Sequence, residues 1–154
     1  MKYLCWAFPV ATALAYGIWN HFSGQVYVGD LPPFDLHLYS FEQAQAYLAG
    51  LTPAAKAIYL GPLHTADTVL LSCLAAMLIL PIWRRGWLWA LPALGYAALD
   101  LLENDRVSDL LRNGLHSAAV VEAIALITTL KFVALCLAAA FALGSLWRKR
   151  RVAR

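Results

Sequence analysis

The chain has 154 residues, of which 62% are hydrophobic and only 14% are charged, and its 12 basic and 9 acidic residues leave a formal net charge of +3. Soluble domains contain about 45–50% apolar and about 25% charged residues, so this composition excludes an ordinary soluble domain and a disordered chain. The few charges also exclude a nucleic-acid partner, because they cannot cover a phosphate-binding surface. We expect one integral membrane domain, residues 1–154, located in the cytoplasmic membrane.

Four apolar segments have the length of a membrane-spanning helix, which needs about 20 residues. All six tryptophans lie near the ends of these segments, where indole rings favour the membrane–water interface. We therefore predict an all-α fold, a multi-pass bundle of four transmembrane helices. A cleavable signal peptide that ends near Ala15 is the alternative reading of the first segment. The predicted spans cover residues 3–22, 63–83, 87–104 and 119–146.

Basic residues are distributed unevenly between the two ends of the predicted bundle. Eight lie near the N-terminus, in the connection between the second and third spans, and in the tail 147–154, against three on the other side. Because cytoplasmic segments carry an excess of Lys and Arg, both termini are predicted to be cytoplasmic. The tail, WRKRRVAR, is interpreted as a basic topology signal that is attracted to anionic lipid.

Residues 23–62 form a long external segment between the first two spans. A Ser-x-x-Gln capping box at Ser40 predicts a short interfacial helix over residues 41–49. A Thr-Pro pair predicts a second short helix over residues 53–60. Tyr59 is interpreted as an interfacial anchor rather than a proton donor.

Five polar residues lie within the predicted spans, where ionisable side chains are costly and usually face the bundle interior. They are Asp67 in the second span, Asp100, Glu103 and Asn104 in the third, and Lys131 in the fourth. At a rise of 1.5 Å per residue, the four ionisable groups lie about 20–24 Å from the cytoplasmic ends of their spans. They therefore share one level, in the outer third of the bilayer.

Three carboxylates face one lysine in this polar layer, so negative charge is left over. The excess predicts a pocket for a small amphipathic, lipid-like or cationic ligand, lined by the five polar residues and by His64, which lies one helical turn before Asp67. One alternative is a membrane-embedded isomerase or hydrolase that acts on a lipid-like substrate. Asp67, Asp100 or Glu103 would then be the general acid or base, with His64 as proton shuttle and Lys131 as electrostatic stabiliser. Another is a structural subunit in which Lys131 simply neutralises a carboxylate and fixes the helices.

We expect no cofactor, because the three cysteines share no metal-type spacing. A bound metal ion is a less favoured alternative, because a hard, oxygen-rich set of ligands accepts several different metals and does not indicate a specific one. The residues that would hold this metal ion are His64, Asp67, Asp100 and Glu103.

Membrane lipids are the expected partners of the protein, and homodimer formation remains open.

Several stretches of the chain resemble a group of small bacterial four-span membrane proteins that have no established activity. These are FEQAQAYLAGLTPAAKAIYL, followed by Asp67, then ALDLLEN and TTLKF. The resemblance covers roughly residues 41–132 and implies the four-span fold with the same polar layer, but Thr68-Val69 replaces the group's aromatic–proline pair. The arrangement also resembles the sterol-isomerase and sigma-2-receptor superfamily, whose members bind sterol-like or amine ligands at acidic residues within the membrane.

Overall fold

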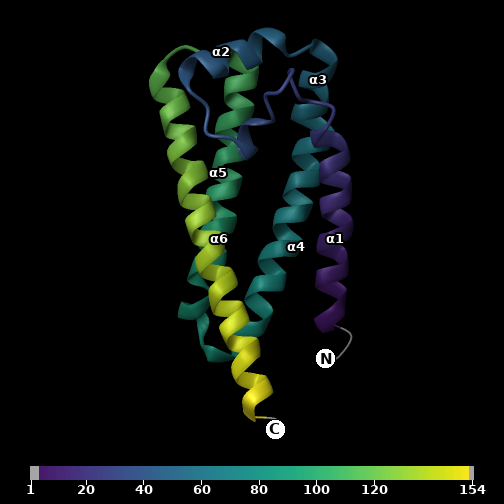
Figure 1. Cartoon of the computed structure of the whole chain (residues 1–154), viewed down its shortest axis with the longest axis vertical. Helices are drawn as coiled ribbons and strands as arrows, with labels where there is room; N and C mark the ends of the chain where they lie inside the picture. Colours follow the sequence, from purple (N-terminus) through teal and green to yellow (C-terminus); the bar gives the residue numbers. More distant parts are fainter. Residues whose placement is uncertain (1–3, 153–154) are drawn as a thin grey trace.

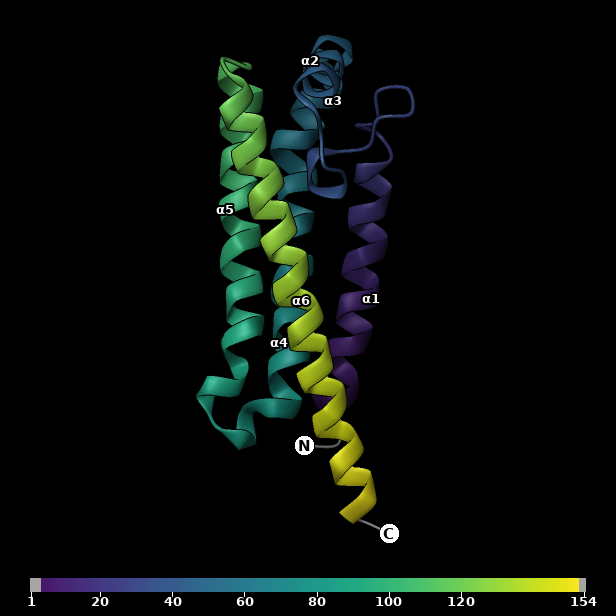
Figure 2. The same cartoon turned by 60° about the vertical axis from the view of Figure 1, so that its left-hand side comes forward.

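The computed structural model describes residues 4–152, and over this range the chain is helical and contains no strand (Figure 1). The predicted all-α class is therefore confirmed. Four long helices lie side by side and alternate in direction, so the start of the first helix and the end of the last share one end of the molecule (Figures 1 and 2). These helices are α1 (Leu4–Ser23), α4 (His64–Ile82), α5 (Leu91–Asn113) and α6 (Ala118–Val152).

Two helices are long and apolar enough to cross a membrane: the continuous helix Pro53–Ile82 and the part Ala118–Trp147 of α6. Only 28% and 22%, respectively, of their most apolar stretches are buried within the protein. Large apolar side chains such as Leu126 and Leu143 are 60% and 66% exposed. Core helices of soluble proteins bury such side chains, so this surface favours an apolar surrounding.

The second predicted span begins earlier than expected. The short helix α3 (Pro53–Ile58) starts at the predicted Thr-Pro pair, where the Thr52 hydroxyl accepts from the Ala55 N–H at 3.1 Å. As predicted, α3 ends close to Leu60, at Ile58, but the helical path does not stop there, because a π-helical turn, η2 (Tyr59–Leu63), continues directly into α4. This turn contains Pro62, which has no N–H to donate within an α-helix.

The helix that contains most of the third predicted span ends later than expected. Two short 3₁₀ turns, η3 (Trp83–Arg85) and η4 (Trp87–Ala90), precede α5, which continues past Asn104 to Asn113. The exposed charged residues in this extension end the apolar stretch from which the span was predicted. Charged residues are compatible with an α-helix, so the helix continues beyond them. The helix ends at Gly114, whose φ of +82° is unfavourable for other residues and whose N–H donates to the Leu110 carbonyl at 2.9 Å.

The predicted capping box is confirmed at the start of α2 (Phe41–Gly50). The Gln43 N–H donates to the Ser40 hydroxyl at 3.2 Å, and the Ser40 N–H donates to the Gln43 side chain at 3.0 Å. At the other end of α2, a Cβ on Gly50 would lie 2.3 Å from a Val28 methyl group. Glycine therefore lets the preceding loop pack closely against this helix.

The external segment folds into a cap over one end of the helices (Figure 2). Its centre is an aromatic cluster in which the rings of Phe34 and Tyr47 lie 5.1 Å apart, edge to face. The Tyr47 hydroxyl donates to the Val26 carbonyl at 2.7 Å, and all three residues are buried. Phe34 begins a single 3₁₀ turn, η1 (Phe34–Leu36), that points toward the helices. The cap thus brings a loop against the polar layer.

Candidate functional site

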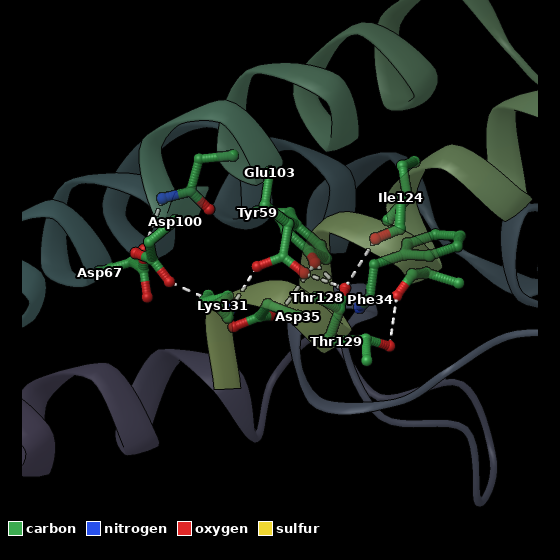
Figure 3. Close-up of polar contacts among 12 residues, drawn as sticks. Phe34, Asp35, Tyr59, Asp67, Asp100, Glu103, Ile124, Thr128, Thr129 and Lys131 are labelled. Atoms are coloured by element: carbon green, nitrogen blue, oxygen red, sulfur yellow. Dashed lines mark hydrogen bonds and ion pairs between the residues drawn. The ribbon is translucent and has the colours of Figure 1, made fainter. Parts of the chain in front are cut away.

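Lys131 of α6 lies between two carboxylates of α5 (Figure 3). Its Nζ atom is 3.0 Å from Asp100 Oδ1 and also donates to Glu103 Oε2. The two carboxylates are three residues apart, so they share one face of α5. Exposure of the three residues is only 5% for Lys131, 4% for Asp100 and 0% for Glu103. The contact is therefore a buried ion-pair cluster that joins the last two helices.

Thr128 lies one helical turn before Lys131 and also contacts Glu103. Its hydroxyl donates to Glu103 Oε1 and is 2.9 Å from the Ile124 carbonyl of its own helix. Both oxygens of Glu103 therefore have partners, one in Thr128 and the other in Lys131. This carboxylate is fully bonded, as a buried charge requires.

Asp67 extends the polar layer to α4. The Asn104 side-chain amide donates to Asp67 Oδ2 at 2.5 Å, which links α4 to α5. Asp67 also lies within electrostatic reach of Asp100. Both Asp67 and Asn104 are partly exposed, so the layer reaches the surface of the molecule here.

A fourth carboxylate, which is not part of the predicted polar layer, comes from the cap. Asp35 of η1 lies within electrostatic reach of Lys131 and accepts a hydrogen bond from the Tyr59 hydroxyl at 3.2 Å. Burial raises the pKa of the Asp35 carboxyl, although the positive charge of Lys131 acts in the opposite direction. No helical spacing could reveal this residue, because it lies in an irregular loop and its approach depends on how the loop folds back.

Tyr59 holds this loop through two hydrogen bonds. Besides donating to Asp35, its hydroxyl accepts from the Phe34 N–H at 3.0 Å. The side chain is only 8% exposed. The prediction of an interfacial anchor is therefore wrong: the ring is packed under the cap, and the hydroxyl is a hydrogen-bond donor.

We call the four carboxylates and the lysine together the acidic cluster. Lys131 supplies one positive charge for four carboxyl groups, so the other carboxyl groups need protons or a further cation to balance them. One oxygen of the cluster, Asp100 Oδ2, is buried and has no hydrogen-bond partner among the described residues. Such an oxygen is costly unless a proton, a cation or another donor meets it. The cluster consists of Asp35, Asp67, Asp100, Glu103 and Lys131.

His64 does not take part in these contacts. Its backbone carbonyl accepts from the Thr68 hydroxyl at 3.0 Å, but its imidazole makes no hydrogen bond or ion pair with the residues that the structure describes. Within residues 4–152, no group of three or more His, Cys, Asp and Glu side chains is arranged to hold a metal ion. The alternative metal set of His64 with three carboxylates is therefore not assembled.

An apolar groove of about 470 Å³ lies between the cap and α6. On the cap side it is bordered by Leu36, His37 and Leu38, and on the α6 side mainly by apolar residues. Thr128 lines the groove and also bonds to Glu103, so the groove ends against the acidic cluster. This arrangement places an apolar surface next to buried negative charge. The α6 lining consists of Thr128, Thr129, Phe132, Val133, Cys136 and Leu137.

Comparison of the chain with protein-family models, with curated proteins and with solved structures finds no match. The resemblances drawn from the sequence motifs therefore remain expectations, and the function has to be argued from the geometry of the cluster and the groove.

Proposed function

We propose that the protein crosses the cytoplasmic membrane four times, with both termini in the cytoplasm, and binds a small amphipathic ligand that carries a cationic group such as an amine. The cation would lie at the acidic cluster, and the apolar chain of the ligand would follow the groove between the cap and α6. The single observation that carries this proposal is Asp100 Oδ2, a buried carboxylate oxygen with no hydrogen-bond partner in the part of the chain that the structure describes, in a cluster of four carboxylates and one lysine.

Charge balance favours a cationic group over an anionic or neutral one. Lys131 can neutralise only one of the carboxylates, and bringing a further anion into the cluster would add to the unpaired charge. Asp67 and Asn104 are partly exposed, so a cation can approach the α4 edge of the cluster from the surface without opening the ion pairs. The apolar lining of the groove suits a hydrocarbon chain.

A thermal-shift series tests the proposal on purified protein in detergent. Dodecylamine should raise the unfolding temperature, whereas dodecanol, with the same chain and no charge, should not. Ligand at one hundred times its Kd contributes about 2.7 kcal/mol of stability. The shift should disappear in Asp100→Asn but persist in Asp105→Asn, an exposed carboxylate on the same helix. Equal responses to amine and alcohol, or an unchanged response in Asp100→Asn, would contradict amine binding.

A second candidate function is that of a structural subunit in which the cluster clips helices together. The observation that favours it is the position of Lys131, which bonds to both carboxylates of α5 at once. In that case no amine would stabilise the protein, and replacing the charged residues together with apolar or neutral ones would leave the fold and assembly intact. The response to dodecylamine in the thermal-shift series therefore separates the two functions.

A further inference from the structure

A second pocket lies at the opposite end of the molecule from the cap. It has a volume of about 420 Å³ and is formed by the connection between α4 and α5 on one side and by α6 on the other. This is the end where α1 begins and α6 ends (Figures 1 and 2). The pocket differs from the apolar groove because a charged side chain helps to form it. Its lining residues are Arg85, Trp89, Ala140, Phe141 and Gly144.

We propose that this pocket binds an anionic membrane phospholipid, with the lipid phosphate at Arg85. The guanidinium is partly exposed, and among the described residues both ion pairs belong to Lys131, so Arg85 has no carboxylate partner. A guanidinium presents a planar fork of N–H donors that matches two phosphate oxygens. The sequence adds further positive charge at this end, with Arg84 beside Arg85 and a basic run from residue 148 to 151.

The α6 wall of the pocket leaves room for a hydrocarbon chain. Ala140 and Gly144 are four residues apart and therefore lie on one face of the helix. A Cβ added at Gly144 would meet no atom within 4 Å, which shows that the space beside this residue is open. A lipid chain that leaves the headgroup could therefore lie against these two small residues without displacing a side chain.

Two aromatic rings border the same space. Trp89 and Phe141 lie 5.2 Å apart between centroids, at an interplanar angle of 69°. Trp89 remains 45% exposed, and indole rings favour the headgroup level of a membrane. The pocket thus combines a phosphate-binding cation, an aromatic border at headgroup depth and an open face for a chain. A free phosphate ion would use only the first of these features, so we assign the pocket to a lipid.

This inference rests on the proposed insertion in the membrane but not on amine binding by the acidic cluster, so the two can fail separately. The test uses the full chain in micelles that contain equal amounts of phosphatidylglycerol and phosphatidylcholine, with bound lipid counted by native mass spectrometry. The wild type should retain about tenfold more phosphatidylglycerol than phosphatidylcholine. Arg85→Gln should lose this preference, since it removes about one charge-assisted contact.

Each variant in this test is compared with a matched control variant. Arg112→Gln removes an exposed arginine near the cap, and it should leave lipid retention unchanged. Gly144→Leu should fill the open face and lower retention, whereas Gly95→Leu, at another helical glycine with open space, should not. Equal retention of both lipids, or the same loss in Arg85→Gln and Arg112→Gln, would overturn the proposal. Displacement of the lipid by excess inorganic phosphate would show a free-phosphate site instead and would also overturn it.

Discussion

The hydroxyl of Tyr59 and the carboxylate of Asp35 lie 3.2 Å apart, and this bond connects the cap to the helix that continues into α4. The same hydroxyl accepts from the Phe34 N–H, so one side chain holds both the main chain and the side chain of the loop. The position of Asp35 next to the acidic cluster depends on this contact.

Tyr59→Phe should loosen the cap. The variant keeps the ring but leaves the Phe34 N–H and the Asp35 carboxylate without this partner, which should cost about 1–3 kcal/mol. Hydrogen exchange measured by mass spectrometry should show faster exchange in residues 33–40. Tyr27→Phe, at an exposed tyrosine in the same segment, is the control and should have little effect. Unchanged exchange in Tyr59→Phe would mean that packing of the aromatic cluster alone holds the loop.

Lys131→Met should destabilise the protein strongly. It leaves Asp100 and Glu103 buried without their cation, and removing one partner of a buried ion pair costs about 3–5 kcal/mol. The loss should appear as a lower unfolding temperature in detergent.

A combined variant provides the complementary measurement. Lys131→Met together with Asp100→Leu and Glu103→Gln removes the three charges of the ion pairs at once, and it should recover most of the stability that Lys131→Met loses. A combined variant as unstable as Lys131→Met alone would contradict this expectation. That result would show that the ion pairs themselves, rather than charge balance, maintain the fold.

Asp35 should make stability depend on pH. Because burial raises its folded-state pKa above the unfolded-state value of about 3.9, the stabilising contribution is fully present below that value and is lost as the pH rises through the folded-state pKa. The unfolding temperature of the wild type relative to Asp35→Asn should therefore fall as the pH increases from 4 to 8.

Asp30→Asn serves as the comparison for this pH series, since Asp30 is exposed in the same loop. Its difference from the wild type should stay constant with pH. The titratable groups that interact with Asp35 are retained in both variants. They are Lys131, Tyr59, Asp100, Glu103, Asp67, Tyr39 and Tyr47. A pH-independent difference between wild type and Asp35→Asn would contradict the pKa shift.

The four-span topology predicts opposite locations for the cap and the α4–α5 connection. In a variant without the three native cysteines, a single cysteine at Asp30 should react with a membrane-impermeant maleimide in intact cells. A single cysteine introduced by Trp87→Cys, at an exposed position of the α4–α5 connection, should react only after the cells are permeabilised. Labelling of both positions from the same side would contradict four crossings.

The local features of this protein follow from its sequence. An excess of apolar residues predicts helices with exposed apolar surfaces, and the helical repeat places Asp100 and Glu103 on one face because the period of 3.6 residues depends only on the local backbone. The capping box at Ser40 is likewise confirmed, since both of its partners lie within four residues. The equal depths counted for Asp100, Glu103 and Lys131 agree with their contacts in the structure.

Only the tertiary structure decides which polar groups meet. Asp35 joins the cluster because an irregular loop folds back under Tyr59, and such a contact has no periodic signal in the sequence. Helical spacing put His64 on the same face as Asp67, yet its imidazole makes none of the cluster's contacts. Whether every oxygen of a carboxylate has a partner is also a property of three-dimensional packing. Asp100 Oδ2, which has no hydrogen-bond partner among residues 4–152 and carries the proposed function, could therefore be found only in the folded chain.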